Sequence, residues 1–142
     1  MSRPIVEITH RLEFSAAHRL ESPHLTAQEN QDLYGPCYTD HGHNYALEAT
    51  VAGEVSAETG MVMNLARLAE ILHEELYVPM DHKHLNRDVP FLEGVIPTAE
   101  NVAVACWDRV EPRLKGIEGC RLHRIKLFES RNNIVEYYGP KV

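Results

Sequence analysis

Two histidines separated by one residue are the most chemically informative feature of this sequence. His41 and His43 flank Gly42 at the start of a stretch in which apolar and polar residues alternate. In an extended strand, residues two apart point to the same face, so both imidazoles can bind one metal ion. A third histidine, His18, follows the first alternating stretch of the chain. If the two stretches pair as a hairpin, His18 lies beside His41.

These three histidines predict a zinc site. Three neutral imidazoles suit Zn²⁺, and three protein ligands leave a fourth position open to water or substrate. That open position is typical of a catalytic rather than a structural site. An isolated pair of histidines is more often an ordinary surface or core pair, but the strand end at His18 and the nearby Cys37 favour metal binding. We therefore predict Zn²⁺ on His18, His41 and His43.

Cys37 lies four residues before His41 and has two interpretations. It is either the fourth ligand of a closed structural site or a thiolate base or nucleophile close to the metal. Positive charge near a thiol lowers its pKa and makes it more reactive. A closed site would leave no position for a substrate.

Two further groups could do acid–base or binding chemistry. Asp81 beside His82 is either a carboxylate that orients a proton-transferring imidazole or part of a solvated loop. Glu129 shares parity with apolar residues of a strand, so its carboxylate is predicted to face inward. It then either pairs with an Arg or Lys of the protein or receives a ligand that carries adjacent N–H donors. Glu100, two residues after the helix-capping Thr98, also complements a helix dipole.

The elements that position these residues follow in the order ββααββ. Alternation predicts the strands, and leucine or apolar stripes behind Asn64 and Thr98 predict the helices. We expect Pro79 to end the first helix, and Pro112 to kink or end the second. Residues 21–40 are predicted as a long loop and 80–97 as irregular. The predicted strands and helices span 6–14, 44–53, 64–77, 98–114, 123–129 and 134–138.

This order predicts an α+β fold in one domain, residues 1–142, with a four-stranded antiparallel sheet and both helices on one face. The open sheet edges favour pairing between subunits. With 44% hydrophobic and 25% charged residues, the composition is that of a soluble globular protein. No segment suits a membrane span or a signal peptide, so we expect no membrane partner. The net charge of −7 without a basic run argues against nucleic acid, and three cysteines favour the reducing cytoplasm.

Several strings of the sequence, in order along nearly the whole chain, resemble the 6-pyruvoyl-tetrahydropterin synthase and 6-carboxytetrahydropterin synthase family. They are FSAAHRL (14–20), CYTDHGHNY (37–45), TGMVMNL (59–65), DHKHLN (81–86), PTAENVA (97–103) and LFES followed by NNIV. The combination of HGHN with an upstream cysteine and a downstream Asp-His pair is highly specific.

The resemblance implies the tunnelling fold, a homohexamer built as a dimer of trimers, and active sites at subunit interfaces. It implies zinc on the three histidines and Cys37 as the proton-abstracting base. Asp81 and His82 of a neighbouring subunit would form the relay of Cys37. Glu129, assisted by Thr98 and Glu100, would bind the pterin. The implied substrate is 7,8-dihydroneopterin triphosphate. Arg19, Lys83 and Arg87 are candidates to balance the negative charge of its triphosphate group.

Two product branches follow from the resemblance. The short spacing from Cys37 to His41 is similar to the carboxy branch, which releases acetaldehyde on the route to queuosine, whereas TGMVMNL, DHKHLN and ENVA are similar to the pyruvoyl branch of biopterin synthesis. Because the active-site loop is nearer the chemistry, we expect the carboxy product, with the pyruvoyl product as the alternative. A noncatalytic zinc- or pterin-binding module and metal-dependent hydrolysis of another substrate are the remaining hypotheses.

Overall fold

The two long strands of the protein come from its two alternating stretches. In the computed structural model, which describes residues 3–141, β1 is Ile5–His18 and β2 is His41–Glu54. They pair antiparallel along their whole length, and the last pair is His18 opposite His41. Both strands are longer than predicted, so these two histidines belong to the ladder itself. The predicted hairpin pairing of the two strands is confirmed.

The sheet has five strands in the order β3-β1-β2-β4-β5, and the α+β prediction is confirmed. β4 (Cys120–Phe128) and β5 (Ile134–Tyr137) complete the four predicted antiparallel strands. The fifth strand, β3 (Lys83–His84), pairs in parallel with Ala16–Ala17 of β1 in a segment predicted to be irregular. A two-residue strand leaves no periodicity in the sequence, because its hydrogen bonds depend on tertiary structure.

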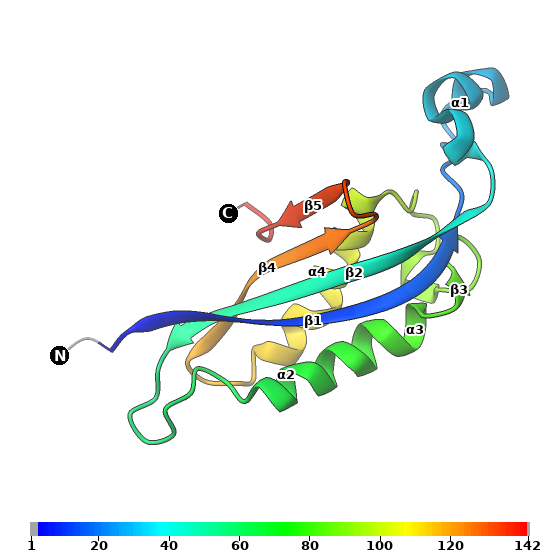
Figure 1. Ribbon diagram of the computed structural model, residues 1–142. Helices are drawn as coiled ribbons and strands as arrows, with labels where there is room; N and C mark the ends of the chain where they lie inside the picture. The colour runs from blue at the N-terminus through cyan, green and yellow to red at the C-terminus, as the bar shows by residue number, and fades with distance from the viewer. Residues whose placement is uncertain (1–2, 142) are drawn as a thin grey trace.

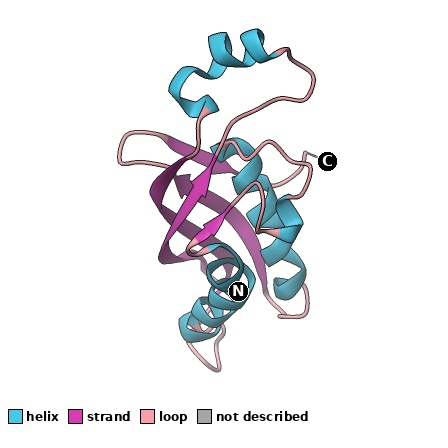
Figure 2. Ribbon diagram, turned by 90° about the vertical axis from the view of Figure 1, so that its right-hand side faces the viewer, coloured by secondary structure: helices cyan, strands magenta, loops and turns pink. Residues whose placement is uncertain are grey.

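Helices cover one face of this sheet, as Figures 1 and 2 show, and bury one apolar core. Asn64 caps α2 (Leu65–Leu72), and Thr98 caps α4 (Ala99–Leu114), each through a side-chain oxygen that accepts a backbone N–H. Tyr45, Leu47 and Leu68 are among the fully buried side chains beneath the helices. No helix within residues 3–141 is long and apolar enough to cross a membrane.

The expectation that Pro79 ends the first helix was wrong. After α2 the chain continues through a π-helical turn, His73–Tyr77, into α3 (Val78–Met80). The wider turn places Pro79 at the start of α3, where its missing N–H is no loss. The helix α4 continues past Pro112 to Leu114, so this proline lies in its last turn.

The segment predicted as a long loop, residues 21–40, contains α1 (Ala27–Tyr34) and a 3₁₀ turn (Gly35–Tyr38). A second 3₁₀ turn, Pro90–Leu92, lies in the stretch before α4. Thr26 and Glu29 form a capping box, in which each side chain accepts the other residue's backbone N–H. Figure 1 shows α1 standing apart from the core, beyond the ends of β1 and β2. It therefore lies at the same end of the sheet as the three histidines.

Candidate metal centre and substrate pocket

The three predicted metal ligands meet at the paired ends of β1 and β2. His18 pairs with His41, and Ala16 pairs with His43, so the three side chains share one face of the sheet. One ring nitrogen from each lies within 4.8 Å of the others. The Nε2 atoms of all three are buried and have no hydrogen-bond partner in the described chain. Buried polar atoms without partners are rare, and here they converge on one point, so the cluster could hold a metal ion.

Backbone carbonyls orient two of these imidazoles. His18 Nδ1 lies 2.8 Å from the carbonyl oxygen of Pro97, and His41 Nδ1 lies 2.7 Å from that of Thr39. A carbonyl only accepts, so each Nδ1 carries the proton and donates it. The Nε2 lone pair of each ring is then free toward the cluster, an arrangement that is usual around metal-binding histidines.

The electrostatics of the cluster favour neutral rings, which metal binding requires. Burial is the largest cause that lowers the pKa of His18, to about 4, and it outweighs the opposing hydrogen bond to Pro97. Burial also lowers the pKa of His43. These two rings are therefore neutral near pH 7, and their Nε2 lone pairs are available without loss of a proton.

Cys37 lies on the 3₁₀ turn just before β2 and is partly buried. Its carbonyl accepts a hydrogen bond of 2.9 Å from the backbone N–H of Leu20, two residues beyond His18. This bond fixes the cysteine segment beside the end of β1. Within residues 3–141, the group of clustered metal-binding atoms consists of the three imidazoles and does not include the Cys37 thiol. The geometry therefore does not place Cys37 as a fourth ligand.

A pocket of about 480 Å³ adjoins the metal centre and contains all three predicted pterin-binding residues. We call it the Glu129 pocket; its lining includes Leu20, Thr98, Glu100, Glu129, Asn132 and Asn133. Glu129 Oε2 lies 4.0 Å from His18 Nε2, and this contact connects the pocket to the histidines. The Asn132–Asn133 lining was not predicted, although the sequence marks these residues as a turn close to Glu129.

The Glu129 carboxylate is available for a ligand. It is 19% exposed, and within residues 3–141 no Lys or Arg lies within ion-pair distance and no N–H donates to its carboxylate. The alternative that this carboxylate pairs with a cation of its own chain is therefore wrong. A half-buried carboxylate gains from a partner with N–H donors, which the pocket can admit. Thr98, in contrast, uses its hydroxyl oxygen to cap α4 by accepting the N–H of Asn101.

Asp81 and His82 form a pair at the sheet edge, apart from the histidine cluster. Asp81 Oδ2 lies 2.6 Å from His82 Nδ1, and Asp81 Oδ1 accepts the N–H of Ser15 at 3.0 Å. This backbone hydrogen bond is the largest cause that lowers the pKa of Asp81. His82 is 81% exposed and has a φ of 60°, a left-handed conformation that is costly for a residue with a Cβ. Within the described chain, no hydrogen bond joins this pair to Cys37.

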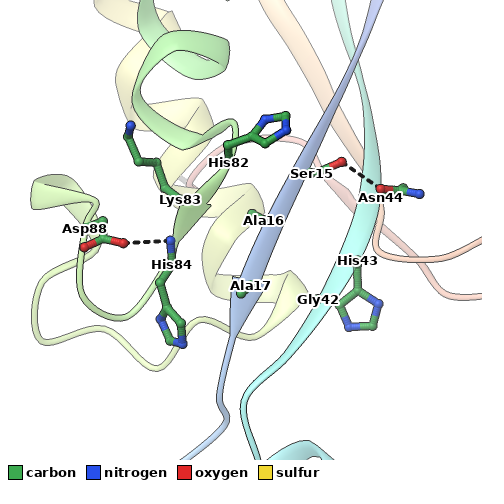
Figure 3. A pocket seen from close by; sticks show the side chains of 10 residues that line it. All are labelled: Ser15, Ala16, Ala17, Gly42, His43, Asn44, His82, Lys83, His84 and Asp88. Carbon is green, nitrogen blue, oxygen red and sulfur yellow. Dashed lines mark hydrogen bonds between the residues drawn. The ribbon is translucent and has the colours of Figure 1, made fainter.

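Figure 3 shows the cleft of about 540 Å³ that lies at this edge, between β3 and the ends of β1 and β2. His82 and His84 line it from the β3 side, and His43 lies at its β2 side. It is more open to solvent than the Glu129 pocket and holds none of the predicted pterin-binding residues. The two cavities therefore flank the metal centre from different sides.

Comparison with known proteins shows which family the chain resembles. The family model of 6-pyruvoyl tetrahydropterin synthase matches residues 7–140. The human 6-pyruvoyl tetrahydrobiopterin synthase is 45% identical over 136 residues, covering 94% of this chain and 91% of the human one. The solved structure of the Caenorhabditis elegans 6-pyruvoyl tetrahydropterin synthase superposes with a TM-score of 0.90 at 35% identity, covering 99% of this chain and 100% of that one.

A relative from the other branch is more distant. The 6-carboxy-5,6,7,8-tetrahydropterin synthase of Rickettsia bellii is 28% identical over an alignment of 148 residues, which covers 93% of this chain and 99% of that one. Sequence and fold thus agree over almost the full length of the chain. The chain belongs to the 6-pyruvoyl tetrahydropterin synthase family and is an enzyme of its lyase type.

Proposed function

We propose that this enzyme converts 7,8-dihydroneopterin triphosphate to 6-pyruvoyl tetrahydropterin with release of triphosphate, as a zinc enzyme of the tetrahydrobiopterin route. The observation that carries the proposal is one continuous site: three imidazoles converge, and the Nε2 atom of one of them, His18, lies 4.0 Å from the carboxylate of Glu129. A metal centre and a recognition group for a heterocycle are therefore in reach of a single substrate. The free cysteines are in keeping with work in the cytoplasm.

The spacing from Cys37 to His41 favours the carboxy product. The relatives support the pyruvoyl product better, so we propose the pyruvoyl product in its place. The human pyruvoyl enzyme is 45% identical to this chain, against 28% for the Rickettsia bellii carboxy enzyme. There is a structural reason why the spacing misleads. The register of β1 against β2 fixes His41, and the three residues between Cys37 and His41 lie before this ladder begins. Their number can change without moving the histidines.

Glu129 provides the recognition step. Its carboxylate can accept two adjacent N–H groups of an amino-pyrimidine ring, a bidentate contact that fixes the orientation of the ring. Thr98 and Glu100 line the same pocket and would complete the contacts to the ring edge. The side chain of the pterin would then extend toward the imidazoles, because His18 Nε2 lies 4.0 Å from the Glu129 carboxylate.

Proton transfer is the role that we assign to Cys37. Zinc, when bound by His18, His41 and His43, would act as a Lewis acid on the side-chain oxygens of the substrate and acidify the adjacent C–H bonds. Cys37, which its hydrogen bond to Leu20 holds beside the end of β1, would take the proton as a thiolate. Expulsion of triphosphate from the neighbouring carbon would leave an enol, and proton shifts from the side chain to its terminal carbon and to the C6 and N5 atoms of the ring would give the two ketone groups and the tetrahydro ring.

The Asp81–His82 pair would serve this chemistry from a neighbouring subunit. Asp81 holds the Nδ1 proton of His82, which leaves Nε2 to pass protons. His82 is highly exposed and lies at a sheet edge, so it is accessible to a second copy of the chain. The edge strand β5 and the exposed apolar side chains of Ile5 and Ile134 also suit pairing between subunits. We propose a homohexamer, a dimer of trimers, with its active sites at these interfaces.

The test of the proposed function is triphosphate release. The zinc-loaded protein is incubated with 7,8-dihydroneopterin triphosphate, and inorganic triphosphate is measured by ion chromatography. We expect stoichiometric release, one triphosphate for each pterin consumed. Zinc-loaded protein that binds the pterin but releases no triphosphate would instead support a noncatalytic binding module.

A substitution of Glu129 tests the recognition step. Glu129→Gln replaces one acceptor oxygen by an NH₂ group, which repels a ring N–H instead of accepting it. We expect the KM for the pterin substrate to rise about 10- to 100-fold, in line with the loss of one charge-assisted bidentate contact. The measurement is steady-state kinetics, with Glu118→Gln, an exposed carboxylate outside the pocket, as the matched control. An unchanged KM in Glu129→Gln would remove Glu129 from substrate binding.

A further inference from the structure

Asp40 is held by two side chains, one from the last residue of β3 and one from the segment that follows it. His84 Nε2 lies 3.0 Å from Asp40 Oδ1, and Arg87 Nη2 lies 3.0 Å from Asp40 Oδ2. Asp40 itself is part of the short link between Cys37 and His41. We call Asp40, His84 and Arg87 the Asp40 clamp. Its two contacts join elements that are more than 40 residues apart in the sequence.

The clamp is built on a rigid donor. The backbone N–H of Asn86 donates to His84 Nδ1 at 3.3 Å, so the proton of the neutral ring is on Nε2 and points at Asp40. Asp88 accepts the backbone N–H of His84 at 3.0 Å, as Figure 3 shows. Only 12% of the His84 side chain is exposed. Ordering a side chain costs conformational entropy. The contacts with Asn86 and Asp88 already order His84, so its hydrogen bond to Asp40 adds little to this cost.

The same segment is also connected, through Arg19, to the residue that directly follows Cys37. Asn86 exchanges two hydrogen bonds with the backbone of Arg19, at 2.9 and 2.8 Å. The Arg19 guanidinium lies over the ring of Tyr38, with its central carbon 4.3 Å from the ring centroid. Two residues that follow Cys37 are therefore tied to residues 84–87, Asp40 directly and Tyr38 through Arg19.

The metal centre does not depend on these contacts. His18, His41 and His43 lie in the β1–β2 ladder, and the backbone pairing of the strands fixes their positions. Cys37 lies outside the ladder, and the hydrogen bond from Leu20 noted above connects its backbone to the end of β1. We infer that Asp40, His84 and Arg87 are positioning residues that fix Cys37 relative to the three imidazoles. This inference rests on the proposed function, in which Cys37 is the base.

The clamp also accounts for the short spacing from Cys37 to His41. Three residues join them, and Thr39 already donates its backbone N–H and its hydroxyl to the carbonyl of Pro36. Asp40 is then the one link residue whose side chain reaches the β3 segment. The clamp thus holds this short, exposed link in one position and, through the link, holds Cys37.

The test compares His84→Ala, Asp40→Asn and Arg87→Ala with the conservative His84→Gln, whose amide N–H can still reach Asp40. Arg67→Ala is the matched control, because Arg67 also makes a 3.0 Å contact to a carboxylate but lies on α2, away from the site. Two quantities are measured on the zinc-loaded protein: kcat and KM for triphosphate release, and the rate at which iodoacetamide alkylates Cys37, located by peptide mass. The alkylation rate needs no turnover, so it tests the clamp even if the proposed function fails.

We expect kcat to fall about 10- to 100-fold in the three disruptive variants with KM within about twofold of the wild type, because small displacements of a catalytic group have effects of this size. The alkylation rate should rise at least about threefold as the link loosens. Zinc content should stay at the wild-type level, and His84→Gln should restore both rates. If kcat and alkylation in His84→Ala match Arg67→Ala, the clamp has no positioning role. A rise in KM alone for Arg87→Ala would assign Arg87 to the triphosphate instead and overturn the inference.

Discussion

Removal of the metal from the three-histidine centre is expected to abolish turnover. Lewis-acid stabilisation of the substrate oxygens is worth several kcal/mol, so the zinc-free enzyme should be at least about 1,000-fold slower. The rings converge with unpartnered Nε2 atoms, and burial keeps at least His18 neutral, so one equivalent of Zn²⁺ should rebind and restore the rate. The measurement is triphosphate release after dialysis against a chelator, followed by a zinc titration.

His41→Ala gives the same loss without a chelator, and added zinc should not restore it. His41 is the best site for this change because it is less buried than His18 and its position depends on strand pairing. His10→Ala is the matched control, since His10 lies on the same face of β1 but outside the cluster. Circular dichroism verifies the fold of both variants. An enzyme that keeps full activity without metal, or a His41→Ala variant with wild-type zinc content, would contradict this role.

Cys37→Ala is expected to lower kcat by about 100- to 10,000-fold, the usual contribution of a positioned general base. Zinc content and thermal midpoint should stay close to those of the wild type, because the thiol is not a member of the metal cluster. The measurements are single-turnover kinetics, zinc analysis and thermal unfolding on the same preparation. Retained zinc together with lost turnover is the outcome that separates a base from a ligand.

Cys120→Ala serves as the control for this variant. Cys120 is also partly buried, but it begins β4, where its thiol lies 3.6 Å from the carbonyl of Ile117. Its removal should leave turnover unchanged. If Cys37→Ala loses zinc and its thermal midpoint falls, Cys37 is a structural ligand, and the assignment of Cys37 as a base would be wrong.

The arrangement of the three histidines could be predicted from sequence because it depends on local rules. Parity places His41 and His43 on one face, and antiparallel pairing of consecutive strands brings the end of the first beside the start of the second. Glu129 could be named from its parity as an inward carboxylate after a strand, whereas Thr98 was predicted from the residues only as a helix cap, and its place in the pocket came from the family resemblance. Their proximity to each other, however, follows only from the packing of α4 on β4.

Other features depend on interactions that no local pattern records. β4 contains a bulge opposite Thr50 and Val51, so that Leu122 rather than His123 joins the inward face with Ile125. Simple alternation along this strand therefore does not hold before Arg124. Among the elements that the sequence analysis missed, α1 has a local signal, because Thr26 and Glu29 have the spacing of a capping box.

The Asp40 clamp shows the same limit at the site itself. Asp40, His84 and Arg87 are ordinary polar residues of exposed segments in the sequence, and Arg87 was assigned there only as a candidate for the charge of the triphosphate. Their hydrogen bonds exist because β3 pairs with β1 and brings residues 84–87 to the cysteine link. The short spacing from Cys37 to His41 therefore does not identify the product. In the structure it corresponds to the link that the Asp40 clamp holds.

The most direct measurement is the identity of the pterin that the zinc-loaded enzyme makes from 7,8-dihydroneopterin triphosphate. Mass spectrometry under anaerobic conditions distinguishes a product that keeps the three-carbon side chain from one that has lost two carbons. The proposed function predicts 6-pyruvoyl tetrahydropterin, one triphosphate per turnover and no acetaldehyde. A 6-carboxy pterin formed together with acetaldehyde would contradict the proposed function and show that the enzyme catalyses the carboxy reaction instead.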